Sequence, residues 1–180
     1  VVHDLKFNKE IFRSDYDHIT GKFTTPSKIY PRKFIVIAGL HPFYLPKQRK
    51  NIDLKIFMNT SDELRKHWKL LRDVKKRGYT ADKVIQQIEV RYEDGNKFIA
   101  PQMEFADLVI EYFGVNEIEI GNSDYEVQLG IKIIFDANVE LDDILNQFST
   151  PFLWDYNNDL KTQFLILEQE PAIDFNLLAN

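Results

Sequence analysis

The sequence contains no cysteine among its 180 residues. This absence excludes a disulfide framework, a thiolate zinc site and a cysteine nucleophile, and it fits a protein of a reducing compartment. No stretch approaches the roughly 18 apolar residues that a membrane-spanning helix needs, and the sequence does not open with a basic and then apolar leader. We therefore expect a soluble, cytoplasmic protein with no membrane partner.

Glycine is also scarce, because the seven glycines stand singly along the chain. The phosphate-binding loop G-x-x-x-x-G-K-[ST] does not occur, so no loop of this type holds nucleotide phosphates within these residues. Positive charge is in deficit, since 28 Asp and Glu outnumber 23 Lys and Arg. The net charge of −5 argues against a nucleic-acid binder, so an anion site must be a local patch.

Apolar residues are abundant, and a 44% hydrophobic chain of this length can bury the core of one domain over residues 1–180. Residues 1–33 are polar and turn-rich, which predicts a loop. The sequence starts at Val1 and its residues 175–180 have the pattern of an unfinished helix. We therefore expect a piece of a longer protein.

Short apolar runs predict three buried strands at 34–39, 53–58 and 107–113. Such runs are typical of parallel strands that are covered on both faces. A turn over 93–96 and a short helical turn over 101–105 are expected before the third strand.

Two helices are expected between the second and third strands. A capping box of Thr60 and Glu63 starts the first helix, and Gly78 ends it. Thr80 caps the second helix, which continues to about Arg91.

From residue 114 the pattern alternates between apolar and polar residues. It predicts antiparallel strands over 125–135 and 163–169, with a short helix over 141–148 between them. The predicted fold is therefore α/β: a mostly parallel sheet with flanking helices over 1–113, extended by antiparallel strands over 114–180 of the same domain.

The first of the two helices carries a cluster of charges. Lys69, Arg72, Asp73, Lys76 and Arg77 share one flank, because residues three and four apart are neighbours on a helix surface. Asp73 can pair with Arg77 at i+4, which leaves Lys69 and Arg72 free to meet a phosphate. The sequence therefore predicts a site for an anion.

A second interpretation of this helix is a charged face in solvent, beside a buried stripe of Leu64, Trp68 and Leu71. In both interpretations Trp68 and Leu71 are expected in the core.

Five ordered motifs then resemble one known family. They are Tyr-Asp-His-Ile-Thr-Gly at 16–21, Gly-Leu-His-Pro at 39–42, Asp-Leu-Lys-Ile at 53–56, Trp-Lys-Leu-Leu-Arg-Asp with Arg-Gly at 68–78, and Ile-Ala-Pro-Gln with Ala-Asp at 99–107. Their order is similar to that of the phosphoribulokinase and uridine kinase family, and fits its phosphoribulokinase branch better. The similarity runs from about residue 10 to residue 112.

The resemblance implies a P-loop kinase fold and the transfer of a phosphoryl group from ATP, with Mg²⁺, to a sugar hydroxyl. Among catalytic residues, it implies that Arg72 contacts the transferring phosphates and that Lys69 stabilises charge in the transition state. Asp73 matches the acid that orients them. ATP and Mg²⁺ are implied for the intact parent protein, and neither is expected on this chain alone.

The resemblance also implies substrate-binding residues. Arg77 and Arg91 match positions that hold the sugar phosphate, and Tyr16, His18 and His41 match positions near the sugar. Two of these have simpler alternatives, because His41 can cap a turn and Tyr16 can serve packing alone. No metal ligand is assigned, and the expected partner is a sugar phosphate or another phosphate anion.

The chain departs from the family pattern in two ways. The phosphate loop, the catalytic base and the first substrate arginines belong to a region that these residues do not include. The family usually has glutamate before Gly-Leu-His, where this chain has Ala38, which puts Mg²⁺ handling in doubt.

Two functions follow from these departures. The first is a fragment of a phosphoribulokinase-like kinase, and the alternative is an inactive regulatory or scaffold protein that keeps an anion pocket. An unpaired sheet edge would favour a homo-oligomer in either case.

Overall fold

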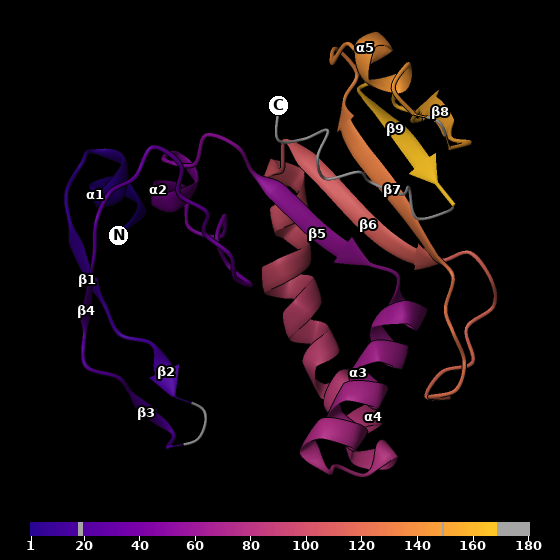
Figure 1. The fold of residues 1–180 in the computed structure, drawn as a ribbon, viewed down its shortest axis with the longest axis horizontal. Helices are drawn as coiled ribbons and strands as arrows, with labels where there is room; N and C mark the ends of the chain where they lie inside the picture. The colour runs from indigo at the N-terminus through magenta and orange to yellow at the C-terminus, as the bar shows by residue number, and fades with distance from the viewer. Residues whose placement is uncertain (18–19, 149, 169–180) are drawn as a thin grey trace. The chain divides into compact units, whose positions relative to one another are not determined.

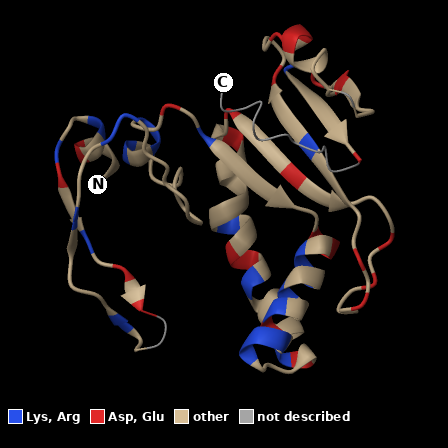
Figure 2. Cartoon of the chain, in the orientation of Figure 1, with Lys and Arg blue, Asp and Glu red and all other residues tan. Residues whose placement is uncertain are grey.

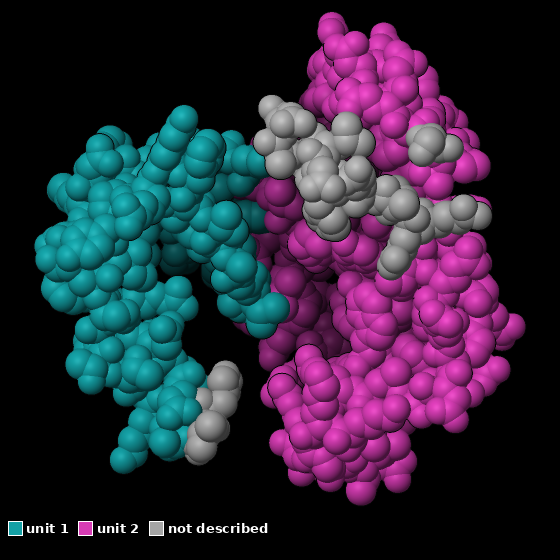
Figure 3. All heavy atoms as spheres, in the orientation of Figure 1, with its two compact units in different colours: residues 1–54 teal, residues 55–180 magenta. Residues whose placement is uncertain are grey.

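The computed structural model describes residues 1–17, 20–148 and 150–168. The chain divides into two compact units, Val1–Leu54 and Lys55–Asn180 (Figure 3). The helix predicted over 175–180 lies outside the described residues. Whether the chain acts as a single domain therefore stays a prediction, and each unit is described by itself.

The first unit contains two small hairpins where the sequence predicts a loop. β1 (Ile11–Arg13) pairs antiparallel with β4 (Ser27–Ile29), and β2 (Tyr16–Asp17) pairs with β3 (Lys22–Phe23). Two short helices complete the unit, α1 (Val2–Lys6) and α2 (Pro46–Arg49). The loop prediction for 1–33 is wrong in these segments, because polar strands that pair in a two-stranded ribbon carry little apolar signal.

The run at 34–39 is not a strand, so that prediction is wrong. Phe34 is 81% exposed and Val36 is 93% exposed. A strand needs a neighbouring strand to accept and donate its backbone hydrogen bonds. In the described residues no strand pairs with this run, and its apolar side chains remain in solvent.

The second unit is built on a five-stranded sheet of order β5-β6-β7-β9-β8 (Figure 1). Its strands are β5 (Ile56–Thr60), β6 (Leu108–Gly114), β7 (Leu129–Asp136), β9 (Thr162–Leu167) and β8 (Leu153–Tyr156). β5 and β6 run parallel, and the other three pairs are antiparallel. The α/β class and the antiparallel extension of the same sheet are confirmed, with one parallel pair among the described strands.

Two helices connect the parallel strands. α3 (Asp62–Arg77) leaves the carboxyl end of β5, and α4 (Ala81–Asp94) returns beside it toward the start of β6 (Figure 1). The Thr80 cap is confirmed, because its Oγ1 accepts a hydrogen bond from Lys83 N at 3.4 Å.

The predicted capping box of Thr60 and Glu63 is wrong. Thr60 is the last residue of β5, and the N-cap of α3 is Ser61, whose side chain makes no cap hydrogen bond. β5 ends at Thr60, two residues after the predicted end at residue 58. The strand continues because β6 runs beside it, with Thr60 paired to Tyr112.

The predicted turn over 93–96 is also wrong, since helical structure continues without a break. α4 leads into a π-helical segment, Gly95–Ile99, and then into a 3₁₀ helix, Ala100–Phe105. The 3₁₀ helix confirms the helical turn predicted after Pro101. Near the C-terminal strands, α5 (Asp142–Leu145) confirms the short helix predicted over 141–148.

The core of the second unit lies where β7 and β9 pack beneath the segment that includes α5. Phe135, Leu141 and Leu165 form one buried cluster there, and Leu64 of α3 and Val84 of α4 are fully buried as well. At the other end of the sheet, Asp107 accepts hydrogen bonds from Lys55 Nζ at 2.7 Å and Lys55 N at 2.8 Å. Burial raises the pKa of Asp107, but these two bonds outweigh it and hold that pKa below its usual value. No helix among the described residues has both the length and the apolar content to cross a membrane.

Candidate functional site

The candidate site is built on α3, whose sequence determines both of its ends. Asp62 and Glu63 lie in its first turn and three basic residues lie in its last turn, which matches the sign of the helix dipole at each end. Gly78 ends the helix in the left-handed conformation, with φ of 66°, which a residue without a Cβ adopts at little cost. Lys and Arg gather along α3 toward this turn (Figure 2).

Asp73 is the centre of the charged cluster. Its side chain is fully buried, and it lies within ion-pair distance of three cationic groups. Lys69 Nζ donates to Oδ2 at 3.0 Å, and Arg72 Nε donates to Oδ1 at 2.8 Å. Arg77 Nη1 lies 3.2 Å from Oδ1, so the predicted i+4 pair of Asp73 and Arg77 is confirmed.

These contacts fix the charge state of Asp73. The hydrogen bond from Arg72 is the largest influence on its pKa, and together with Lys69 it outweighs burial and lowers that pKa to about 2. The same hydrogen bond raises the pKa of Arg72 above its usual value. Asp73 is therefore ionised at neutral pH, and its single charge faces three positive ones.

The prediction that Lys69 and Arg72 are free is wrong, because both bind Asp73. A buried carboxylate attracts every cation within reach of its lone pairs, and both residues lie close enough along the helix. The cluster nevertheless keeps a surplus of positive charge. The side chains of Arg72 and Arg77 are 51% and 54% exposed, so their guanidinium groups still reach solvent, whereas that of Lys69 is only 19% exposed.

The other predicted site residues belong to other segments of the chain. Arg91 lies in the last turn of α4, at the end of that helix farthest from the Gly78 turn. Tyr16 lies in β2, in the first unit, where its ring meets Phe23 edge-on at 5.4 Å. His41 also lies in the first unit, in a turn after the exposed run, with its ring 5.8 Å from that of Tyr44. His18 lies outside the described residues.

Trp68 and Leu71 are not in the core, which corrects their prediction. The buried residues of α3 are Leu64, His67, Leu70 and Asp73. Trp68 is 42% exposed, and with Leu71 it lines a cavity beside the helix. His67 turns inward, where its Nδ1 lies 3.2 Å from Glu119 O and 3.3 Å from Gly121 N. The ring tautomer sets whether this nitrogen donates to the carbonyl or accepts from the amide.

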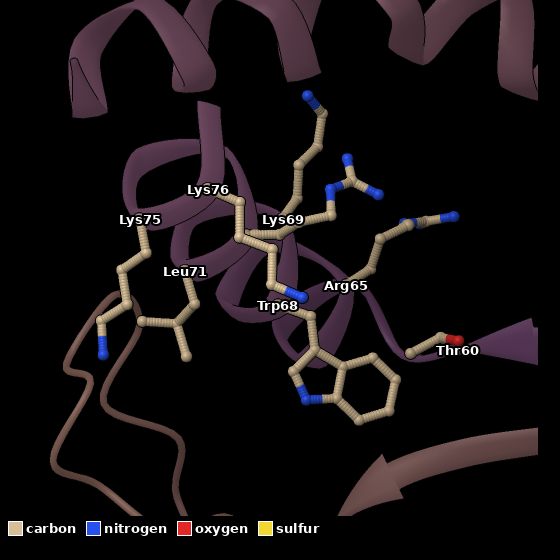
Figure 4. Close-up of a pocket in the computed structure, with 8 residues that line it drawn as sticks. Thr60, Arg65, Trp68, Lys69, Leu71, Lys75 and Lys76 are labelled. Carbon is tan, nitrogen blue, oxygen red and sulfur yellow. The ribbon is translucent and has the colours of Figure 1, made fainter. Parts of the chain in front are cut away.

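The cavity beside Trp68 also contains cationic residues that the sequence alone did not single out. Arg65 and Lys75 line it with Lys76 (Figure 4). Their spacing of three or four residues from Trp68 and Arg72 is the signal that could have identified them, because it puts them on one helix face.

The described residues do not fit the magnesium ion that the family resemblance implies. No group of three or more His, Asp or Glu side chains among them could hold a metal ion. Ala38, where the resemblance expects glutamate, offers no ligand and lies in the exposed run. The phosphate loop that would hold ATP does not occur in the sequence either.

A sequence model described as the Phosphoribulokinase / Uridine kinase family matches residues 1–119. A phosphoribulokinase of Synechocystis is 35% identical over 118 residues, which cover 66% of this chain and 36% of that protein. A chloroplastic phosphoribulokinase of Mesembryanthemum crystallinum is 32% identical, over 88% of this chain and 38% of its own length. A uridine kinase of Listeria monocytogenes is 35% identical, over 64% of this chain and 56% of its own.

A solved phosphoribulokinase from Rhodobacter spheroides superposes with a TM-score of 0.69 at 16% identity, covering 93% of this chain and 63% of that one. This likeness shows a shared fold, and the P-loop kinase type of α/β fold is thereby confirmed. The chain spans little more than a third of the length of the two phosphoribulokinase relatives. Because the family match covers most of the chain, this protein belongs to the phosphoribulokinase and uridine kinase family.

Proposed function

We propose that this chain is a fragment of a phosphoribulokinase-like, ATP-dependent kinase that acts on a sugar or sugar phosphate. In this proposal the chain carries the phosphate-clamping helix and part of the sugar-phosphate site. The observation that carries it is the cluster of three cationic side chains around buried Asp73. ATP and Mg²⁺ belong to the intact parent, through residues that this chain does not contribute.

The electrostatics of the cluster support this proposal. Phosphoryl transfer depends mainly on positioning and on neutralising charge that develops on the phosphate oxygens. Ionised Asp73 holds Arg72 through Nε, so the rest of that guanidinium is pre-oriented toward solvent. Arg72 would contact the transferring phosphates, Lys69 would stabilise transition-state charge, and Asp73 would orient both.

The substrate side of the site is part of the same proposal. Arg77, held by Asp73 and half exposed, would bind the phosphate of the acceptor. Arg91, Tyr16, His18 and His41 would complete this part of the site in the parent protein.

Titration calorimetry with ribulose 5-phosphate tests the proposal. We expect weak binding that falls as salt rises, and a five- to tenfold loss of affinity in Arg77→Ala. Lys66→Ala removes the same charge from an exposed position of α3 outside the cluster, and should change affinity little. Equal binding by wild type and Arg77→Ala would show that Arg77 holds no phosphate and would overturn the proposal.

Ala38 favours a second candidate, an inactive regulatory or scaffold protein that keeps the anion pocket. Where a metal-assisting acid is expected, this chain has a methyl group, and no truncation accounts for that difference. The residues encoded before Val1 decide between the two. A strand followed by a phosphate loop there, with kinase activity of the full-length protein, supports the enzyme, whereas their absence supports the scaffold.

A further inference from the structure

The sheet of the second unit ends in an exposed strand, β8. In the part of the chain that the structure describes, β8 pairs with β9 alone and is the last strand in the sheet order (Figure 1). All of its residues are exposed, and among them Trp154 is 41% and Tyr156 is 42% exposed. A strand with one open edge can pair with a further strand, because its outward backbone groups lack a strand partner there.

The register shows which backbone groups face this open edge. Asn157 N donates to Thr162 O of the neighbouring strand segment at 2.9 Å. Inward and outward residues alternate along an antiparallel strand, so Trp154 and Tyr156 direct their backbone groups away from β9. Tyr156 N already donates to Asp155 Oδ1 at 2.7 Å. The open edge therefore offers the amide of Trp154 and the carbonyls of Trp154 and Tyr156.

Trp154 and Tyr156 form a fixed aromatic pair on one face of β8. Their ring centroids are 5.6 Å apart. The indole of Trp154 donates from Nε1 to Oε1 of Gln163 at 2.8 Å. Gln163 is buried, and its Nε2 donates to Asp136 O at 3.1 Å and to Val139 O at 2.7 Å. An exposed ring that is held in this way loses little conformational entropy when a partner binds it, as anchor residues of interfaces do.

The charge around β8 is of one sign. Between Lys132 and Lys161 the sequence has no Lys or Arg, and Figure 2 shows Asp and Glu over α5. The acidic residues of this stretch are all exposed, and they are Asp136, Glu140, Asp142, Asp143, Asp155 and Asp159. Their charge of −6 exceeds the net −5 of the chain, so all other residues together sum to +1. Among the described residues, no cationic group lies within ion-pair distance of these six carboxylates.

The aromatic pair and the carboxylates together favour a cationic partner. Lys and Arg side chains bind the faces of Trp and Tyr rings and also pair with carboxylates. A second copy of this chain would bring the same carboxylates to the edge, and their repulsion opposes the pairing of two β8 strands. Nucleic acids and anionic lipids are repelled for the same reason. Because Trp154 and Tyr156 are two residues apart, a strand with cations at alternate positions matches their spacing.

We propose that the open edge of β8 binds an extended segment of a partner protein in which Lys or Arg alternates with apolar residues. The segment adds to the sheet beside β8 and places its cationic side chains over Trp154 and Tyr156. This surface goes beyond the proposed function. It lies past residue 119, where the family match ends, and β8 contributes no residue to the cluster around Asp73.

Fluorescence anisotropy of a dye-labelled peptide with four Arg-Val repeats tests the proposal on the whole chain. We expect binding that weakens as salt rises, and no measurable binding of a peptide with four Glu-Val repeats. Proline in place of the two central valines keeps the charge of the Arg-Val peptide but prevents its pairing as a strand. This change should weaken binding about tenfold.

Aromatic variants of the chain locate the site. Trp154→Leu should weaken binding of the Arg-Val peptide about tenfold. Tyr156→Leu should weaken it severalfold, and it leaves the bond between Trp154 and Gln163 in place, so it tests the surface even if Trp154→Leu does not fold. Trp68→Leu is the matched control, because it removes an indole of nearly equal exposure, 42%, from α3. It should leave binding unchanged.

Charge variants test the carboxylates. Asp142→Asn with Asp143→Asn, in the first turn of α5, should weaken binding of the Arg-Val peptide about threefold. Glu117→Gln with Glu126→Gln removes the same charge from exposed positions before β7 and should have little effect. Equal losses in the two double variants would mean that only the net charge of the chain matters, and would overturn the proposal.

Three further results would also overturn it. They are tight binding of the Glu-Val peptide, undiminished binding of the proline-containing peptide, and equal binding by wild type and both aromatic variants. Pairing of two copies through this edge, which light scattering would show as a dimer that Trp154→Leu converts to a monomer, would likewise contradict the proposal. Tyr156→Leu should bind ribulose 5-phosphate as wild type does, so this surface and the proposed function can fail independently.

Discussion

Asp73 is the residue on which the charged face of α3 depends. It is fully buried, yet it stays ionised because three cationic side chains surround its two oxygens. A lone carboxylate in such a position would be costly, and a lone cluster of three cations would repel itself. The four side chains therefore stabilise one another. The cations offset the cost of burying the carboxylate, and the carboxylate reduces the repulsion among the cations.

Replacing Asp73 by Asn should destabilise the fold. The lowered pKa of Asp73, about 2 against 3.8, corresponds to a contribution of about 1–2 kcal/mol to the free energy of unfolding at neutral pH, because solvent around half-exposed Arg72 and Arg77 screens part of the interaction. Asp73→Asn removes this contribution and leaves Lys69 largely covered without its counter-charge. Urea unfolding of both proteins at pH 7 measures the difference. Asp62→Asn, whose partner Arg65 is exposed, should cost less than about 1 kcal/mol.

The same carboxylate predicts a pH dependence with a definite sign. Because the pKa of Asp73 is lower in the folded chain, its contribution is fully present above about pH 4 and is lost as the pH falls through about 2. The difference in unfolding free energy between wild type and Asp73→Asn should therefore shrink over that window. A difference that stays constant from pH 7 down to about pH 2.5 would show that the charge of Asp73 is not its source.

At the scale of elements, α3 shows that a helix can be predicted more easily than the face it buries. The sequence predicts the helix and its end at Gly78, but assigns Leu64, Trp68 and Leu71 to the core. The structure buries positions three apart, including His67 and Asp73, because the segment near Glu119 supplies polar partners for His67 and the cations supply partners for Asp73. Both sets of residues have helical spacing, so periodicity alone does not choose between them.

The pairing of β6 with β7 depends on a glycine. Gly130 faces Phe113 across the two strands, and a Cβ on residue 130 would lie 2.6 Å from Cε2 of that ring. Gly130→Ala should therefore lower the free energy of unfolding by about 1–3 kcal/mol through overpacking. Thermal or urea unfolding measures the loss, and Phe113→Leu in the same chain should recover part of it.

Gly95→Ala is the matched control for Gly130→Ala. A Cβ at residue 95 meets no atom within 4 Å, and the backbone there is helical. It should be neutral or slightly stabilising, because alanine loses less conformational entropy in a helix. A loss of stability as large as that of Gly130→Ala would mean that the close approach to Phe113 is not the cause.

At the scale of the whole molecule, the run from Phe34 to Ile37 is an exposed apolar segment without a partner strand in the described residues. Four consecutive apolar residues with high strand propensity favour pairing between chains. Val36→Lys should therefore reduce self-association measured by light scattering, with little change in the unfolding midpoint. Val90→Lys, which adds the same charge at an exposed position of α4, should leave self-association as it is.

The sequence by itself determined the family, the α/β class, the charged helix α3 and the pairing of Asp73 with Arg77. These features depend on local patterns, namely ordered motifs, apolar runs, caps and i+4 spacing, which act between residues close in the chain.

Only the tertiary structure decided that Lys69 and Arg72 are held by Asp73, that Trp68 lines a cavity, and that the run at 34–39 has no partner strand. The exposure of Trp68 and the missing strand partner depend on packing between distant segments, whereas the contacts of Lys69 and Arg72 with Asp73 lie within one helix and depend on the burial of that carboxylate. The buried carboxylate of Asp73 attracts the cations near it, and Trp68 stays exposed because no described segment covers its ring. The run at 34–39 forms no strand because no neighbouring strand in the described part of the chain accepts and donates its backbone hydrogen bonds.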